Sequence, residues 1–411
     1  MPQGQGEGEL GVHAAGEVLH LLLRVEAEAL DHPRDPGRGS RDPDSARQVV
    51  AGRAAAASAP SPQEGRVVPG DLAKPGSAAA GRRLAGALER HESPGPGSRD
   101  PGSRLQAVPG DLSKPRMGLT PDAFSSLAER VDAVLHLAAD LDAFASYGDL
   151  EPANVGGTRE VLRLAFRHGA PVHHVSSSAV FPLETSWPEE TFGLQAMRSL
   201  GVDLEASGAD GYSLSKLGAE LLLWSAFERG LPVSVVRVPH LLGDQAGTDG
   251  RSRDRLTSVV RAFAAAGVFP EGDWFWQLAP VDAVCRELVS LLETGPPPGR
   301  PVRHVTLESL GAAQLLDGLR SRGLELEPLP LPALASALIS AAEGGAGQQA
   351  APGGPEYRDV CAAAQLIHQH GPRAALNLAD ARLLTKRPLP GNPASLFFHS
   401  IGRHAESGAP R

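Results

Sequence analysis

The sequence contains little cysteine, few aromatic residues and no long apolar or basic run. Only two of its 411 residues are cysteines, Cys285 and Cys361, which cannot form a disulfide framework and lack metal-ligand spacing. No segment approaches the roughly 20 apolar residues that a membrane-spanning helix needs. The apolar stretch 18–23 follows acidic rather than basic residues and is a poor match to a signal peptide. These absences predict a cytoplasmic protein with no metal and no membrane partner.

Charge and composition narrow the class further. The formal net charge is -9, and lysine and arginine do not cluster, whereas nucleic-acid binding requires clustered cations to neutralise phosphates. We therefore expect no nucleic-acid partner. A hydrophobic content of 41% supports a core, and the length suits one large or two modest domains.

The chain changes character near Leu105. Before it, glycine, proline, alanine, serine and arginine dominate and strand patterns are scarce. The same region repeats itself, because VVPGDLAKP from Val67 recurs as AVPGDLSKP from Ala107. Two copies do not make a solenoid, which needs at least three regular units. We interpret residues 1–78 as a low-complexity or aberrant N-terminal region.

Beyond Leu105, short valine-rich runs alternate with longer amphipathic stretches. The runs predict buried strands at 105–108, 131–137, 171–176 and 232–238. The stretches predict helices at 121–130, 152–168 and 212–229. Strands that alternate with helices indicate an α/β protein with a parallel sheet. Ligands of such sheets bind beyond the carboxyl ends of the strands, so candidate residues are sought there.

The most specific pattern is YSLSK, which places Tyr212 and Lys216 four residues apart on one face of a predicted helix. An ammonium beside a phenol lowers the phenol's pKa from its reference value of about 10. The pair therefore predicts a tyrosine that exchanges a proton at neutral pH. The alternative is a surface tyrosine stacked near a lysine.

Three predicted strands end in candidate ligand-binding residues. Asp111 and Leu112 follow the first, where a carboxylate could accept hydrogen bonds from adenine, although Asp is also a common turn residue. Ala138 and Ala139 follow the second, where small side chains allow a ligand near the backbone or simply pack the sheet. The third ends in VSSSAVF, residues 175–181, whose three hydroxyls are either catalytic or merely solvated.

The order GDL, HLAA, hydroxyl cluster, YxxxK and strand resembles the extended short-chain dehydrogenase/reductase family. The segment VDAVLHLAADLDAFASYGDLEPANVGGTREVLRLA is similar to its thioester reductase branch, the male sterility/NAD-binding type. Such domains end peptide and polyketide synthetases and occur in carboxylic acid reductases. The resemblance implies a Rossmann-like, doubly wound parallel sheet over 79–300 and a smaller, mostly helical lobe for substrate or carrier over 301–411.

The resemblance also implies residue roles. Counting back from Phe181 assigns Ser177 to a catalytic triad with Tyr212 and Lys216, with Ser176 and Ser178 as alternatives one residue away. Tyr212 and Lys216 are also expected to contact the cofactor, with Lys216 holding the ribose hydroxyls. The other implied positions contact or support the cofactor: Asp111 and Leu112 beside adenine, Ala138 and Ala139 near a ribose, and Asn154 in support of the site.

The implied function is reduction by NADPH of an acyl thioester, presented by a phosphopantetheinyl carrier domain or as a small molecule, to an aldehyde or alcohol. NADP rather than NAD is expected from the resemblance alone. Two alternatives stay open. One is another extended short-chain reductase or epimerase acting on a nucleotide-sugar, and the other is a catalytically impaired protein that only binds a carrier.

Several positions depart from the family pattern. The expected TGATGFLG-like phosphate loop after a first strand is missing, and GQGEGELGVH, residues 4–13, is a poor substitute because Glu7 and Glu9 would repel phosphate. The two strands expected before Ala79 are therefore interpreted as missing or scrambled. Asp282 in PVDAV is expected to cap a helix. Trp274 and Trp276 are expected to form a partly buried pair or to line an acyl channel.

Overall fold

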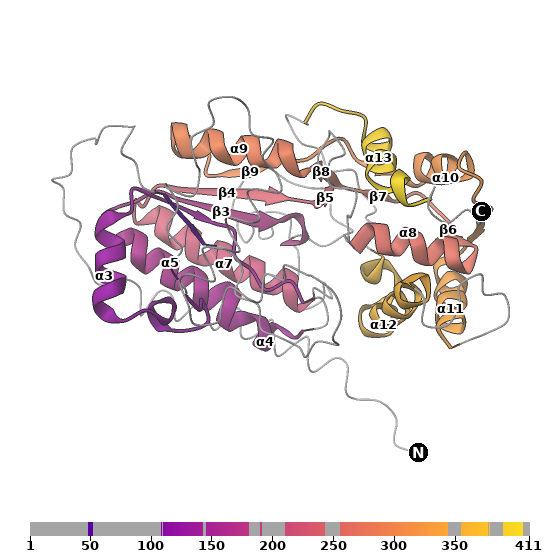
Figure 1. Ribbon diagram of the computed structural model, residues 1–411, viewed down its shortest axis with the longest axis horizontal. Coiled ribbons are helices and arrows are strands. Elements are labelled where there is room, and N and C mark those ends of the chain that lie inside the picture. The colour runs from indigo at the N-terminus through magenta and orange to yellow at the C-terminus, as the bar shows by residue number, and fades with distance from the viewer. Residues whose placement is uncertain are drawn as a thin grey trace, which may run out of the picture.

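A five-stranded parallel sheet lies at the centre of the larger lobe of the molecule, with helices on both sides (Figure 1). The computed structural model describes residues 48–51, 108, 110–142, 145–180, 190, 210–242, 255–343, 355–376, 378 and 389–405. Within these ranges the strand order is β1-β2-β3-β4-β9, and every neighbouring pair is parallel. The strands are β1 (Gln48–Ala51), β2 (Ala133–His136), β3 (Val172–Ser177), β4 (Val233–Val238) and β9 (Val302–His304).

The predicted strands at 131–137, 171–176 and 232–238 are confirmed as β2, β3 and β4. The prediction at 105–108 is not supported, because Val108 is an exposed residue outside any strand and residues 105–107 lie outside the described ranges. Conversely, β1 arises from a region where no strand was expected. The strand has only four residues, QVVA, which are too few to show the alternation of apolar and polar residues that identifies a strand. It also lies in a glycine- and alanine-rich part of the sequence.

Helices cover both faces of the sheet (Figure 1). One face carries α3 (Pro121–Arg130), α4 (Tyr147–Glu151), α5 (Gly157–Phe166) and α7 (Gly211–Glu228), and the other carries α9 (Val281–Thr294). These positions confirm the three predicted helices, with one refinement. The stretch predicted as a single helix at 152–168 begins with a π-helical turn, η5 (Pro152–Gly156), which connects α4 directly to α5.

Each face of the sheet has its own apolar layer. Val134, Val172 and Val235 pack with Leu214, Leu221 and other apolar residues under α5 and α7. Leu135, Val236 and Val238 pack against Leu288 and Leu291 of α9. Because side chains alternate along a strand, neighbouring residues of β3 point to different layers. His174 and Ser176 therefore face α7, and His173 faces the opposite side.

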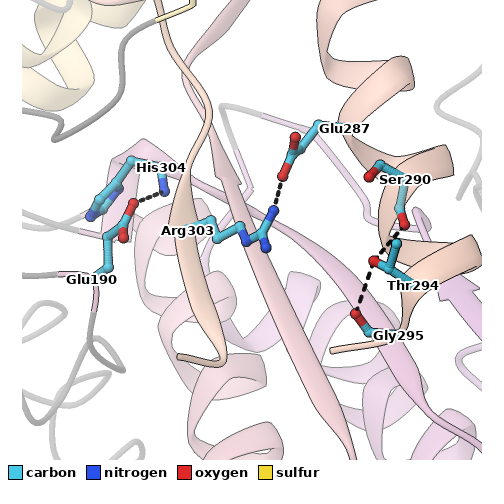
Figure 2. A network of polar contacts seen from close by, with 7 residues as sticks. All are labelled: Glu190, Glu287, Ser290, Thr294, Gly295, Arg303 and His304. Atoms are coloured by element: carbon cyan, nitrogen blue, oxygen red, sulfur yellow. Dashed lines mark hydrogen bonds and ion pairs between the residues drawn. The ribbon is translucent and has the colours of Figure 1, made fainter. Parts of the chain in front are cut away.

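The helix α9 is tied to the edge strand β9 by polar contacts (Figure 2). Arg303 of β9 forms an ion pair with Glu287 of α9, and the backbone N–H of His304 donates to Glu190, 3.3 Å away. At the end of α9, the Thr294 hydroxyl donates to the carbonyl of Ser290 at 2.8 Å. Of these contacts, the Arg303–Glu287 ion pair is the one that joins β9 to α9, and β9 is held to β4 by parallel strand pairing.

The expected capping role of Asp282 is wrong. Pro280 occupies the N-cap position of α9, and the carboxylate of Asp282 lies inside the first turn, where it pairs with Arg286 at 2.8 Å. A carboxylate in the first turn still interacts favourably with the positive end of the helix dipole, which explains its place there.

The C-terminal lobe is mostly helical, as expected, and has a separate core. Its helices are α8 (Arg255–Ala266), α10 (Ala312–Arg320), α11 (Leu331–Ala342), α12 (Pro355–Ala375) and α13 (Pro393–Ala405). Short two-stranded pairings lie among them: β5 (His240–Leu242) with β8 (Leu278–Pro280), β6 (Val268–Pro270) with β11 (Glu327–Leu329), and β7 (Phe275–Trp276) with β10 (Leu310–Gly311). The division of the chain at residue 300 stays a prediction.

Trp274 and Trp276 form the aromatic centre of this lobe. Both are buried, with ring centroids 5.3 Å apart, and their indole N–H groups donate to the carbonyls of Pro270 and Leu376. The buried pair is confirmed, and the alternative role in an acyl channel is not what the structure shows, since neither ring is accessible.

The packing of α9 gives a testable prediction. Replacing Leu291, which is 1% exposed, with alanine removes apolar contacts from the layer under α9 and should lower the free energy of unfolding by about 2–5 kcal/mol. Val289 is 52% exposed on the same helix, so Val289→Ala should change it by no more than about 0.5 kcal/mol. Urea unfolding followed by circular dichroism measures both values, and equal losses would contradict the observed packing of α9.

Candidate active site

Tyr212 lies in the first turn of α7, at the carboxyl end of the sheet. The side chain of Asp210 caps this helix by accepting from the Ser213 N–H at 2.7 Å. Ser177, the last residue of β3, lies beside the phenol, close enough for hydrogen bonding to influence the pKa of Tyr212. Burial raises the pKa of Tyr212 to about 12, the Ser177 hydrogen bond opposes that rise, and the charge of Asp210 adds to it. Tyr212 is therefore a protonated phenol at neutral pH.

Lys216 is buried one turn further along α7, and its ammonium lies against β3. Its Nζ donates to the carbonyl of Val175 at 2.8 Å and lies 3.3 Å from Nε2 of His174. Burial lowers the pKa of Lys216 to about 8, and the charge of Glu220 opposes this. The expectation that Lys216 lowers the Tyr212 pKa is wrong for this structure, because burial of the phenol dominates and the ammonium is bonded to β3.

Of the three serines, Ser177 is the one whose hydroxyl influences the pKa of Tyr212. Ser176 is buried on the α7 face, where its hydroxyl donates to Glu220 at 2.6 Å. Ser178 begins a short 3-10 turn, and no contact with Tyr212 is present among the described residues. Phe181, from which the triad position was counted, lies outside the described ranges. The geometry thus brings together Ser177, Tyr212 and Lys216, whose catalytic roles stay predictions.

Asn154 connects the loop after β2 to α7. Its Oδ1 accepts from the Asp140 N–H at 2.6 Å, and its Nδ2 donates to the Asp140 carbonyl at 3.1 Å and to the Ser215 hydroxyl at 2.8 Å. The Ser215 hydroxyl in turn donates to the carbonyl of Tyr212. The π-helical turn η5 supplies this geometry, as π turns often do at functional sites. Asn154 thereby fixes the backbone on either side of the candidate site.

Ala138 and Ala139 lie in that same loop. Both are buried, at 2% and 9% exposure, directly after β2. Asn154 forms a hydrogen bond with the backbone of Asp140, the residue that follows them. Asn154 thus holds the outer end of the loop, and β2 holds the other end. The small side chains leave the loop backbone close to the carboxyl end of the sheet.

Asp111 and Leu112 lie in a turn on the outer side of α5. The Asp111 carboxylate accepts from the backbone N–H and hydroxyl of Ser113 and pairs with Lys114 at 3.1 Å, and these contacts, the Ser113 hydrogen bonds foremost, lower its pKa. Leu112 is buried against Gly157, where an added Cβ would meet the Leu112 Cβ at 3.0 Å. The turn role of Asp111 is thus observed, and its role beside adenine stays a prediction.

A buried ion pair beneath the site was missed from the sequence. Glu220 accepts from Nε and a terminal nitrogen of Arg237 at 2.8 and 2.6 Å, in addition to the Ser176 hydroxyl. Both charged side chains are almost fully buried. A signal was present, because Glu220 follows Lys216 by four residues and so shares its helix face with Tyr212.

Buried histidines surround the same face of the sheet. The rings of His136 and His174, on neighbouring strands, lie 4.8 Å apart, and Nε2 of His136 lies 3.1 Å from the Thr158 hydroxyl. The Thr158 hydroxyl also donates to the Asn154 carbonyl at 2.6 Å. Sequence reasoning treated these histidines only as part of strands.

No metal site is present in the described part of the chain, where no three His, Cys, Asp or Glu side chains gather. The described helices include none long and apolar enough to cross a membrane. The glycine-containing segment 4–13 lies outside the described ranges, as do the residues that follow β1.

A close backbone approach at Gly211 makes a prediction about the site. A Cβ at Gly211 would lie 2.6 Å from the Tyr147 nitrogen and 2.7 Å from the Ala145 carbonyl oxygen, so Gly211→Ala must displace α4 from the start of α7. We expect it to lower the free energy of unfolding by about 1–3 kcal/mol, measured by urea unfolding. Gly156→Ala is the control, because its nearest neighbour would be 3.7 Å away and alanine favours helix. A stable Gly211→Ala protein would contradict the close approach.

The buried histidines predict a dependence of stability on pH. Burial, as the first cause in each case, lowers the pKa of His136, His173 and His304 to about 3, 4 and 3. The unfolded chain, with pKa values near 6.5, then binds more protons than the folded one, so stability is complete above pH 6.5 and falls as pH drops toward 3. We expect a loss of about 2 kcal/mol per histidine between pH 8 and pH 5.

Urea unfolding at pH 8, 6.5 and 5 measures this loss. His173→Gln removes one of the three groups and should reduce the difference between pH 8 and pH 5. Equal stability at all three pH values would show that the imidazoles are not held neutral by burial.

Comparison with known proteins assigns a family. The sequence profile described as "Male sterility protein", an NAD-binding family, matches residues 72–288, a little over half of the chain. A glycine betaine reductase of Emericella nidulans is 36% identical over 230 residues, which are 55% of this chain and 18% of the relative. An isonitrile lipopeptide synthase of Streptomyces coeruleorubidus is 35% identical over 262 residues, which are 62% of this chain and 17% of the relative. The chain thus spans less than a fifth of these curated relatives.

Solved structures agree with this family. The terminal R domain from the myxalamid PKS-NRPS biosynthetic pathway matches with a TM-score of 0.63 and 26% identity, over 82% of each chain. The PhqB reductase domain from Penicillium fellutanum matches with a TM-score of 0.56 and 18% identity, over 96% of this chain and 89% of that one, which shows the same fold. The profile match over most of the sheet, together with these folds, shows that the chain belongs to the male sterility protein family of NAD-binding reductase domains.

Proposed function

We propose that this chain is an NADPH-dependent reductase of an acyl thioester carried by a phosphopantetheinyl carrier domain. The observation that carries the proposal is the placement of Ser177 beside the Tyr212 phenol at the carboxyl end of β3, with the Lys216 ammonium bonded to Val175 of the same strand. Family membership supports a nicotinamide cofactor. Relatives that include a lipopeptide synthase and an L-2-aminoadipate reductase large subunit support a thioester substrate.

The protonation state of Tyr212 suits the reductive direction. A phenol with a pKa of about 12 arrives at the reaction protonated, as a proton donor must. The nicotinamide, when bound, supplies the hydride. The Tyr212 O–H would donate its proton to the substrate oxygen, and the Ser177 hydroxyl would donate a hydrogen bond to the same oxygen as negative charge grows there. With a thioester, the protonated product is a hemithioacetal, which collapses to an aldehyde and a thiol.

The residues present fit the ribose end of a nicotinamide cofactor. A lysine ammonium has three N–H donors, and the described contacts of Lys216 use two, so one N–H is available for a ribose hydroxyl. The loop of Ala138 and Ala139 offers small side chains, and Asn154 holds it in place. The choice of NADP over NAD, and the contacts of Asp111 and Leu112 with adenine, belong to the proposal.

A single-turnover assay tests the proposal. The full chain is mixed with NADPH and an acyl-pantetheine thioester, and loss of absorbance at 340 nm is followed. Tyr212→Phe and Ser177→Ala should each lower the single-turnover rate constant by at least about 100-fold with little change in the apparent Kd for the thioester, because their hydrogen bonds to the substrate oxygen matter most in the transition state. Ser178→Ala is the matched control and should retain activity, since no contact with Tyr212 is described for it.

Several outcomes would contradict the proposal. Full activity of Tyr212→Phe would show that Tyr212 is not the proton donor. Activity on nucleotide-sugars but not on thioesters would show that the substrate belongs to a different class. A protein that binds a carrier domain but gains no thermal stability from NADPH would be a carrier-binding protein without turnover, because a ligand of the native state must stabilise it. Replacing NADPH by NADH in the same assay decides the cofactor.

A further inference from the structure

The ammonium of Lys216 is held by β3 through two acceptors, one of which is a side chain. The backbone carbonyl of Val175 lies 2.8 Å from Nζ, and Nε2 of His174 lies 3.3 Å from it. Lys216 and His174 are 3% and 1% exposed, so water does not compete for these contacts. An ammonium only donates, so Nε2 of His174 must accept, and the ring proton must therefore reside on Nδ1.

The imidazole at this position carries a cost. Nδ1 of His174 is buried and has no partner among the described residues, and a buried donor left unpaired destabilises the folded state. An apolar side chain of similar size would avoid this cost while packing against the ring of His136, 4.8 Å away. The benefit that offsets the cost must come from Nε2, whose described partner is the Lys216 ammonium.

We propose that His174 is a positioning residue, whose Nε2 and the neighbouring Val175 carbonyl fix the Lys216 ammonium so that its third N–H serves a ligand at the carboxyl end of β3. The proposal deepens the proposed reductase function and rests on it for the identity of that ligand. The hydrogen bond itself exists in the protein alone and can be tested without turnover.

Other charged groups face Lys216 and must be included in any titration. Glu220 on α7 raises the pKa of Lys216, and Arg237 on β4 partly offsets that charge through its ion pair with Glu220. Among the described residues, Tyr212 on α7 is a protonated phenol, and His136 on β2 and His304 on β9 are held neutral at pH 7 by burial. These groups are present in every variant, and because the His136 ring contacts His174, the His174→Gln variant is compared with His174→Leu to isolate the contact with Lys216.

The experiment is an NMR titration of protein labelled with lysine carrying 13C at the ε carbon. The chain has only four lysines, so the Lys216 signal is identified by its loss in Lys216→Arg. The wild-type midpoint is expected near pH 8. His174→Leu removes an acceptor from the charged form and should lower the midpoint by about one pH unit or more. His174→Gln, which offers a carbonyl oxygen as acceptor, should return the Lys216 midpoint most of the way to the wild-type value.

His173→Leu is the matched control, because His173 is the adjacent strand residue on the opposite face of the sheet and is equally buried. It should leave the Lys216 midpoint unchanged. An unchanged midpoint in folded His174→Leu, or an equal shift in His173→Leu, would overturn the proposal. If His174→Leu does not fold, the ring 15N shifts of His174 in the wild type decide, because a proton on Nε2 would exclude the contact and a proton on Nδ1 supports it.

NADPH binding separates this proposal from the reductase assignment. We expect His174→Leu to weaken the apparent Kd for NADPH about tenfold, and His174→Gln to change it little. Wild-type protein that shows the expected lysine titration but binds no NADPH would refute the reductase function while supporting the positioning role. If the wild-type protein reduces a thioester with NADPH, but the Lys216 midpoint is the same in wild type and His174→Leu, the reductase function is supported and the positioning role of His174 is refuted.

Discussion

The structure of the site depends on one buried carboxylate. Glu220 accepts from Ser176 of β3 and from Arg237 of β4, so a single side chain of α7 joins the helix to two strands. Ser176 directly precedes Ser177, and Tyr212 lies two turns before Glu220 on the same helix. The contacts of Glu220 beneath the site therefore fix the position of the Tyr212 phenol relative to the Ser177 hydroxyl. A buried carboxylate is tolerated there because the guanidinium compensates its charge.

Asn154 also joins α7 to the rest of the site, but it does so through a neutral amide rather than a charged carboxylate. It binds the loop after β2 and, through Ser215, the first turn of α7. Asn154 acts within the segment that carries Tyr212 and Lys216, and Glu220 acts one turn beyond Lys216. The candidate site is thus built from rigid elements, and its polar groups are satisfied mainly by the backbone and by one another.

The sequence predicted most of the sheet because β2, β3 and β4 are valine-rich and buried on both faces, and it predicted α7 from YSLSK and its apolar spacing. It could not predict β1, whose four residues show no period, or the direction of the Lys216 ammonium. That direction depends on His174, which meets Lys216 only through the pairing of strand and helix. The Tyr212 pKa was misjudged for the same reason, since spacing along a helix reveals proximity but not burial.

The path of the chain between the two cores has a practical consequence. The helical lobe takes residues from α8 and β6 before the chain returns to the sheet as β9, and then from α10 through α13. The chain therefore crosses into the lobe twice and returns to the sheet once, so no single cut yields two intact halves. Expression of either half as a fragment would leave apolar surface uncovered, so domain exchange between such reductases must move sheet and lobe together.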